Sequence, residues 1–108
     1  MATYLVGHIR IKDAILWQQY VDGVRESLQP FAAEVVFRGT KTAVLAGEHA
    51  YEQVVLIRFA DQSTLQHWFT SKQYQSLIPL RDRGAEVVIA SYEEKNGPEL
   101  PTCTESRL

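Results

Sequence analysis

In four stretches of this sequence the side chains divide between two faces with a period of two and hydrophobic residues predominate, which predicts β-strands. In the first stretch, Leu5 and Ile9 fall on one face of the strand, whereas His8 and Arg10 fall on the other. The predicted strands cover residues 3–11, 33–47, 51–60 and 85–93. Gly39 lies within the long second strand, where we expect a bulge or a bend.

Helical spacing begins directly after the first strand. Asp13 is expected to cap a helix that runs to about residue 29, and Pro30 is expected to end it. The hydrophobic stripe of this helix recurs every four residues, at Leu16, Tyr20, Val24 and Leu28.

A second helical region lies between the third and the fourth predicted strands. Asp61 or Ser63 is expected to cap its first helix, and Ser71 to cap a further helical stretch that follows. Pro79 is expected to kink or restart that stretch, and Gly84 suits its end.

The predicted order of elements is strand, helix, strand, strand, helix, strand, which is the split βαβ pattern of the ferredoxin-like fold. We therefore predict an α+β fold, βαββαβ, with a four-stranded antiparallel sheet and helices on one of its faces. Several strands carry hydrophobic side chains on both faces, which indicates that both faces are buried. One layer of helices cannot cover both, so we expect two sheets to pack face to face in a homodimer.

Length, composition and charge restrict the classes of protein that fit. The 108 residues suffice for one domain, which we expect at residues 1–93, followed by a flexible C-terminal tail at residues 94–108. A net charge of −2 provides no basic surface for nucleic acids, and no hydrophobic run approaches the roughly 20 residues of a membrane span. Because no signal-peptide pattern is present, we expect a cytoplasmic protein, and the single Cys103 predicts neither a disulfide nor a metal site.

Residues 68–85, WFTSKQYQSLIPLRDRGA, resemble a segment that is common in the domain-of-unknown-function 1330 family. Members of that family tend to carry an aromatic pair, a serine, a tyrosine three residues later and then a leucine-proline-arginine run. The first strand with Asp13, the stretch FRGTKTAVLAG and the stretch VLIRFADQSTLQHWF are similar to the same family. The resemblance covers residues 3–93, although Thr40 and Ala46 stand where the family usually has a glycine and often a glutamate.

This resemblance implies a member of the dimeric α+β barrel group, in which the sheets of two chains form a barrel. Distant relatives in that group include cofactor-free quinol monooxygenases, muconolactone isomerases and haem proteins similar to chlorite dismutase. The resemblance therefore implies a homodimer but no single chemistry, because one fold hosts many functions.

His8 is the candidate for catalysis. If it lies on the strand face that points away from the helices, it faces the inside of the barrel. There an imidazole could act as a general base toward an acidic phenol or enol. The alternative is a hydrogen-bonded interior histidine at the dimer interface.

Arg38 and Arg58 are candidates for holding the anionic group of a ligand, because an arginine that faces the interior must be paired or must bind an anion. The alternative for both arginines is a structural ion pair with a glutamate. The glutamates that could supply it are Glu34, Glu52 and Glu86.

Tyr20, Trp68 and Tyr74 are candidates for the aromatic wall of a small-molecule pocket where the helices meet the sheet. The alternative is ordinary core packing, which aromatic residues at helical spacing usually serve. We expect no metal site and no cofactor, because the three histidines lie on different elements and no haem ligand can be singled out.

Together these patterns predict a dimeric barrel protein that binds a small hydrophobic or aromatic molecule, and they leave open whether it is an enzyme. In one interpretation it is a cofactor-independent monooxygenase or isomerase that acts on an aromatic or conjugated, weakly acidic substrate. In the alternative it is a non-catalytic accessory protein that binds a ligand in a biosynthetic pathway for secondary metabolites. In a third it is a purely structural dimer with no cavity near Trp68.

Overall fold

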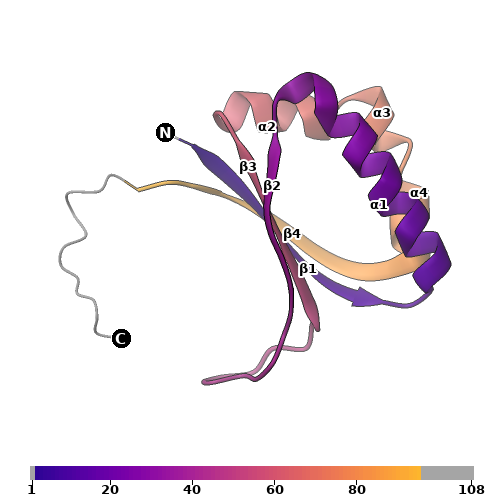
Figure 1. Cartoon of the computed structure of the whole chain (residues 1–108), viewed down its shortest axis with the longest axis vertical. Helices are drawn as coiled ribbons and strands as arrows, with labels where there is room; N and C mark the ends of the chain where they lie inside the picture. Colours follow the sequence, from indigo (N-terminus) through magenta and orange to yellow (C-terminus); the bar gives the residue numbers. More distant parts are fainter. Residues whose placement is uncertain (1, 96–108) are drawn as a thin grey trace.

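The computed structural model describes residues 2–95, which form one four-stranded antiparallel sheet with helices on one face (Figure 1). The strands are β1 (Thr3–Ile11), β2 (Glu34–Thr40), β3 (Gln53–Phe59) and β4 (Ala85–Glu93), in the spatial order β2-β3-β1-β4. The helices are α1 (Ala14–Leu28), α2 (Gln62–Phe69), α3 (Lys72–Gln75) and α4 (Ile78–Gly84), with a 3₁₀ turn at Gln29–Phe31. This arrangement confirms the predicted ferredoxin-like fold.

Polar side chains cap the helices largely where the sequence predicts them. The Asp13 carboxylate accepts hydrogen bonds from two backbone N–H groups in the first turn of α1, at 3.0 and 3.1 Å. Asp61, rather than Ser63, caps α2, and Ser71 caps α3. Pro79 lies in the first turn of α4, where its missing N–H has no intrahelical partner to lose, so a new helix begins there as predicted.

The core lies between the helices and the sheet. Its most deeply buried large side chains include Phe59, Trp68 and Tyr74, which are 1%, 2% and 0% exposed. Leu5 and Ile9 of β1 are also buried on this side, as the alternation in the first strand predicts. The face of β1 that carries Leu5 and Ile9 therefore meets the helices, which is the condition under which His8 points away from them.

Gly84 joins the end of α4 to the start of α1. Its carbonyl oxygen accepts hydrogen bonds from the backbone N–H groups of Lys12 and Asp13, at 2.8 and 3.0 Å. A Cβ atom at this position would lie 2.9 Å from the backbone nitrogen of Trp17, which is closer than real Cβ contacts. The close approach of these two segments therefore requires a glycine.

The second strand differs from its prediction in the place of its irregularity. β2 pairs Val35 with Ile57 of β3 and then Phe37 with Leu56, so that Val36 is an extra residue in a β-bulge. The predicted bulge at the glycine of this strand is therefore wrong by a few residues. The bulge at Val36 could not be predicted from the sequence, because Val35, Val36 and Phe37 are all hydrophobic and show no alternation.

The bulge determines which way the end of β2 points. Because one residue is inserted, Phe37 turns to the uncovered face of the sheet and Arg38 turns toward the helices. In an uninterrupted strand, Arg38 would oppose Val54, which is the partner of His8 on the uncovered face. The bulge thus places Arg38 on the face opposite to His8.

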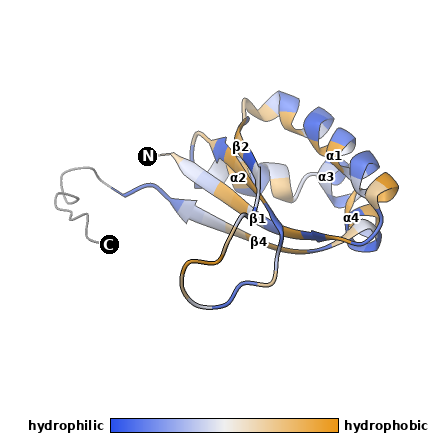
Figure 2. Ribbon diagram, turned by 60° about the horizontal axis from the view of Figure 1, so that its bottom comes forward, coloured by the Kyte–Doolittle hydropathy of each residue, from blue (hydrophilic) through white to orange (hydrophobic). Residues whose placement is uncertain are grey.

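The predicted continuation of the second strand to residue 47 is also wrong. β2 ends at Thr40, and residues 41–52 form a loop that extends beyond the sheet (Figures 1 and 2). A backbone hydrogen bond of 2.6 Å from Lys41 to Glu52 closes the base of this loop. Hydrophobic residues continue into the loop, but Leu45 near its tip is 95% exposed and has no strand partner within residues 2–95.

Hydrophobic side chains also lie on the face of the sheet that no helix of residues 2–95 covers. Phe37, Val88 and Tyr92 occupy this face and are 54%, 47% and 58% exposed. They account for the hydrophobic positions that the sequence shows on both faces of the strands. Within one chain these side chains remain open to solvent.

Two further expectations lie at or beyond the described part of the chain. The predicted flexible tail at residues 94–108 falls outside the described residues except for its first two positions, and Cys103 lies outside them. No helix within residues 2–95 combines the length and the hydrophobicity needed to cross a membrane. The cytoplasmic location and the lack of nucleic-acid binding stay predictions.

Candidate functional site

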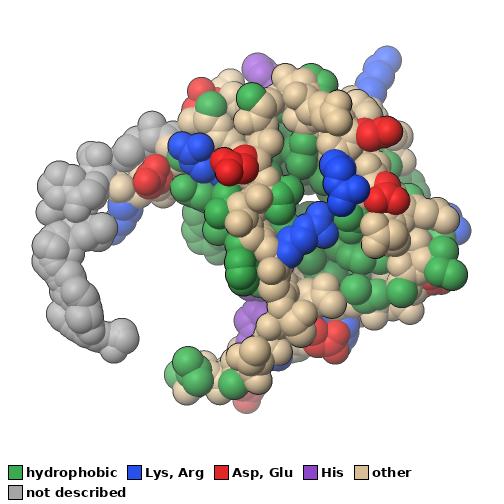
Figure 3. All heavy atoms as spheres, in the orientation of Figure 1, with side chains coloured by type: hydrophobic (Ala, Val, Ile, Leu, Met, Phe, Trp, Pro, Cys, Tyr) green, Lys and Arg blue, Asp and Glu red, His purple; other side chains and the backbone are tan. Residues whose placement is uncertain are grey.

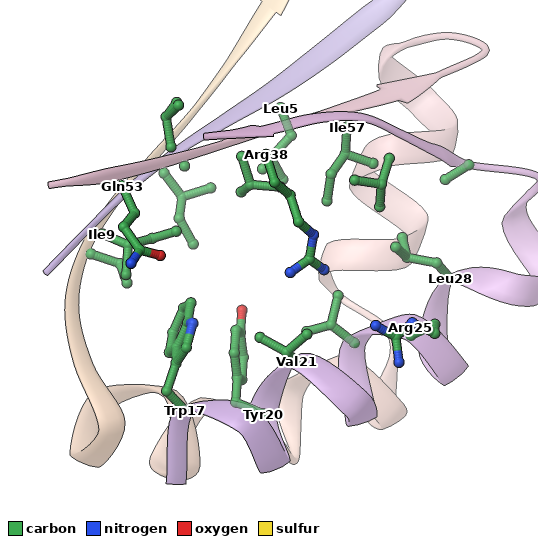
Figure 4. A pocket seen from close by; sticks show the side chains of 18 of the residues that line it. Leu5, Ile9, Trp17, Tyr20, Val21, Arg25, Leu28, Arg38, Gln53 and Ile57 are labelled. Atoms are coloured by element: carbon green, nitrogen blue, oxygen red, sulfur yellow. The ribbon is translucent and has the colours of Figure 1, made fainter. Parts of the chain in front are cut away.

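A cavity of about 450 Å³ lies between α1 and the helix-facing side of the sheet (Figure 4). Most of its walls are hydrophobic, and Figure 3 shows hydrophobic side chains deep in a hollow with basic side chains beside it. Gly7 contributes no side chain at the centre of β1, which leaves space in front of Leu5 and Ile9. The polar side chains that line the cavity are Tyr20, Arg25, Gln29, Arg38, Thr40 and Gln53.

Arg38 reaches into this cavity from β2, opposite α1 (Figure 4). None of the ion pairs within residues 2–95 involves Arg38, so the predicted alternative of a structural pair with a glutamate is not seen there. Arg25, the other arginine of the cavity, is paired with Asp22 at 3.3 Å. Among residues 2–95, Arg38 is therefore the arginine of the cavity that has no ion-pair partner, and its side chain is exposed.

Tyr20 enters the cavity from α1, with its hydroxyl group toward the sheet (Figure 4). That hydroxyl lies 2.8 Å from the hydroxyl of Tyr74, which receives a hydrogen bond of 3.0 Å from Arg81. Burial raises the pKa of Tyr20, and Tyr74 beside it raises that pKa further, so Tyr20 stays protonated. The structure brings Tyr20 to the cavity and places Tyr74 behind it, away from the cavity wall.

Trp68 serves both the cavity and the core. It lines the cavity, yet only 2% of it is exposed, and its indole N–H donates a hydrogen bond of 2.9 Å to the Ser27 hydroxyl. Its ring lies 4.4 Å from the ring of Tyr74 and 5.5 Å from that of Phe59, measured between centroids. The two interpretations of the aromatic cluster, pocket wall and core packing, therefore both describe Trp68.

His8 lies on the opposite face of the sheet from Arg38, where it is paired with Val54 and Val88 of the neighbouring strands. Its ring centroid lies 4.7 Å from that of His49 in the loop after β2. Burial, and then the nearby His49, lowers the pKa of His8 below the ordinary value of 6.5. His8 and Arg38 therefore cannot act on one small ligand within a single chain.

A second hollow, of about 440 Å³, lies beside His8 between the uncovered face of the sheet and the loop at residues 41–52. His49, Tyr51 and Phe37 contribute to its walls. The Nδ1 atom of His8 is buried here and has no hydrogen-bond partner within residues 2–95. This hollow faces the side on which the sequence predicts a second chain.

Arg58 also lies on the uncovered face, where its partner across the sheet is Glu34. The two side chains form an ion pair at 3.9 Å and are each about half exposed or more. This is one of the glutamate pairs that the sequence offers as the alternative to a ligand-binding role. Arg58 does not belong to the cavity that contains Arg38.

Sequence reasoning missed Arg81 and Gln53 as neighbours of the site. Arg81 donates to Tyr74 from α4, and no spacing in the sequence indicates this contact because the two residues lie on separate short helices. Gln53 lies at the strand end beside the cavity and has no distinctive pattern. Within residues 2–95, no three His, Cys, Asp or Glu side chains are grouped so that they could hold a metal ion.

Several solved structures have a similar fold at low sequence identity. A protein of unknown function from Rhodopseudomonas palustris matches with a TM-score of 0.77 and 10% identity, over 89% of this chain and 84% of that chain. SnoaB from Streptomyces nogalater, a cofactor-independent oxygenase, has a TM-score of 0.62 and 9% identity, over 94% and 98% of the two chains. A dimeric ferredoxin-like protein of unknown function from Jannaschia sp. CCS1 has a TM-score of 0.63 and 11% identity, over 87% and 100%. At these identities the similarity shows the fold alone.

The sequence itself matches one family model over nearly all of the described residues. No curated protein matches it at a significant level. The model for the domain of unknown function DUF1330 matches residues 2–94, which include the whole sheet, the helices and the residues of both hollows. The chain therefore belongs to the DUF1330 family.

Proposed function

We propose that this chain binds an aromatic or otherwise conjugated, weakly acidic small molecule in the cavity between α1 and the sheet. The observation that carries the proposal is Arg38, which enters a largely hydrophobic cavity and has no ion-pair partner within residues 2–95. The volume of about 450 Å³ falls within the range of roughly 300–1,000 Å³ that is common for ligand pockets. The hydrophobic walls would accept a ring, and the guanidinium would hold a phenolate or carboxylate oxygen.

The proposal includes a homodimer that forms through the uncovered face of the sheet. Its support is the exposed hydrophobic surface at Phe37, Val88 and Tyr92, together with the dimeric ferredoxin-like protein of similar fold from Jannaschia sp. CCS1. Two such faces packed together would cover these side chains and the hollow beside His8.

If the bound molecule is altered, a cofactor-independent oxygenation or isomerisation is the reaction that suits the site. Such reactions begin from a stabilised anion, which Arg38 and Tyr20 would stabilise from the walls of the cavity. SnoaB, which has a similar fold, is a cofactor-independent oxygenase. His8 would serve as a base only for a molecule in the hollow on the other side of the sheet.

A second candidate function is binding without chemical change, as an accessory protein in a biosynthetic pathway. The observation that favours it concerns the described residues that line the cavity. Their ionisable side chains are those of Tyr20, Arg25 and Arg38, with no imidazole, carboxylate, ammonium or thiol group among them. A reaction in this cavity would have to take its base from the ligand or from water.

The binding proposal is tested with 4-nitrophenol, whose phenolate has a distinct absorption spectrum. We expect the wild-type protein to bind the phenolate and Arg38→Met to weaken that binding by about tenfold to a hundredfold, because a charge-assisted hydrogen bond is lost. Arg58→Met is the matched control, since Arg58 lies on the opposite face of the sheet. Equal losses in the two variants, or no loss in Arg38→Met, would contradict the proposal.

The choice between enzyme and accessory protein needs the natural ligand. Mass spectrometry of small molecules that co-purify with the protein identifies that ligand, and incubation in air shows whether the protein converts it. An altered ligand supports the oxygenase or isomerase, whereas retention of an unchanged ligand supports the accessory protein.

A further inference from the structure

We infer that Tyr20 donates its hydroxyl hydrogen into the cavity, and that Tyr74 and Arg81 behind it fix the direction of this donation. The inference rests on the proposed function and refines its ligand. The ligand would carry an oxyanion that accepts hydrogen bonds from two sides, from Arg38 on the sheet and from Tyr20 on α1 (Figure 4). Tyr74 and Arg81 would be positioning residues, because neither lines the cavity.

The direction follows from the number of hydrogens in the chain of hydrogen bonds. Arg81 can only donate, so the Tyr74 oxygen accepts at their contact of 3.0 Å. Tyr74 is 0% exposed, and the acceptor for its own hydroxyl hydrogen within residues 2–95 is the Tyr20 oxygen, at 2.8 Å. If Tyr20 donated to Tyr74 instead, the hydroxyl hydrogen of Tyr74 would be buried without an acceptor, which is costly.

Once Tyr74 donates to Tyr20, the hydroxyl hydrogen of Tyr20 is left without a partner among residues 2–95. The same hydroxyl group lies at the wall of the cavity and points into it (Figure 4). Because each donor in the chain polarises the next, the Tyr20 hydroxyl becomes a stronger donor than an isolated phenol. An oxygen atom of a ligand, and a charged one above all, is the partner that this donor fits.

The groups behind Tyr20 are held in place by packing and by further hydrogen bonds. The ring of Tyr74 packs against those of Trp68 and Phe69, with centroid distances of 4.4 and 5.0 Å. The Arg81 side chain is 16% exposed and also donates to the Asp82 carboxylate at 3.0 Å. The packing of the helices against the sheet thus fixes the order of donors and acceptors from Arg81 through Tyr74 to Tyr20.

The experiment compares 4-nitrophenol, which ionises, with 4-nitroanisole, which has the same ring but no acidic hydroxyl group. We expect Tyr20→Phe to weaken binding of 4-nitrophenolate by about tenfold. Binding of 4-nitroanisole should stay within about twofold of wild type, because the ring of residue 20 is kept. The absorption spectrum of bound 4-nitrophenol as a function of pH should show a higher pKa of the bound probe in the variant.

A second pair of variants tests the positioning role and does not alter Tyr20. Arg81→Met should weaken binding of 4-nitrophenolate and raise the pKa of the bound probe, whereas Arg83→Met, on the exposed side of α4, should do neither. Thermal unfolding and circular dichroism establish that each variant is folded. If Tyr20→Phe proves unstable, weaker phenolate binding in Arg81→Met together with unchanged binding in Arg83→Met still supports the inference.

Three outcomes would overturn the inference. Unchanged phenolate binding in Tyr20→Phe, with Arg38→Met still defective, removes the role of Tyr20 and leaves the proposed function intact. Equal weakening of both probes in Tyr20→Phe shows that Tyr20 only packs against the ring. A wild-type protein that binds neither probe overturns the proposed function and the inference with it.

Discussion

Trp68 and Ser27 are joined by a buried hydrogen bond of 2.9 Å, from the indole N–H to the serine hydroxyl oxygen. Ser27 in turn donates to the carbonyl oxygen of Val24 at 2.8 Å. We predict that Ser27→Ala lowers the free energy of unfolding by about 1–3 kcal/mol, because the indole N–H is left buried without an acceptor. Chemical denaturation followed by tryptophan fluorescence measures the change.

The matched control for this prediction is Ser76→Ala. Ser76 also donates its hydroxyl hydrogen to a backbone carbonyl one helical turn earlier, at 2.8 Å, but it is exposed and accepts no indole N–H. This variant should stay within about 0.5 kcal/mol of wild type. Similar losses in the two variants would show that the Trp68 contact contributes nothing specific.

The sequence was sufficient to predict the order of elements and most helix boundaries. Alternation in β1 separated Leu5 and Ile9 from His8 and Arg10, and the structure shows that the face with Leu5 and Ile9 meets the helices. Capping residues such as Asp13 act through backbone groups a few positions away, so local sequence determines them.

The candidate site was harder to predict because it depends on one inserted residue in β2. Val36 belongs to a hydrophobic run, so the sequence does not show that the pairing with β3 slips there. The slip sends Arg38 into the cavity, whereas Arg58 and Glu34, which pair before the slip, lie on the other face. The hydrogen bonds that link Tyr20 to Tyr74 and Arg81 could not be predicted either, since they form only when α1 packs against the later helices.

The stability of the fold should depend on the protonation of His8. Its pKa is lowered in the folded protein, chiefly by burial and also by His49, so protons bind more tightly to the unfolded chain. The free energy of unfolding should therefore be constant above the unfolded pKa of about 6.5 and should fall as the pH decreases through and below that value. Denaturation curves between about pH 8 and pH 5 measure the slope.

Two histidine variants separate this effect from a general loss of stability in acid. His8→Gln should reduce the slope between about pH 6.5 and pH 5, because the titrating group is removed. His67→Gln, at an exposed position on α2, is the matched control and should leave the slope unchanged. A slope that survives in His8→Gln would assign the acid sensitivity to other groups.

The uncovered face of the sheet should decide whether the chain dimerises. Val88 is 47% exposed on this face, directly beside His8 in the sheet. We predict that the wild-type protein is a dimer in sedimentation analysis and that Val88→Asp raises the dimer Kd by about a hundredfold or more, since an unpaired carboxylate would be buried between two sheets. Ile15→Asp is the matched control, because Ile15 is 73% exposed on α1, on the other side of the sheet.

A monomeric wild-type protein, or a dimer that both variants weaken equally, would contradict assembly through this face. The result also bears on His8, because its buried Nδ1 atom has no partner within residues 2–95. In a folded Val88→Asp monomer the hollow beside His8 is open to solvent and the new carboxylate is the cross-strand neighbour of His8, and both differences raise the His8 pKa relative to a dimer that covers this face. The pH dependence of stability should then be weaker in this monomer than in the wild-type dimer, which links the two measurements through one surface.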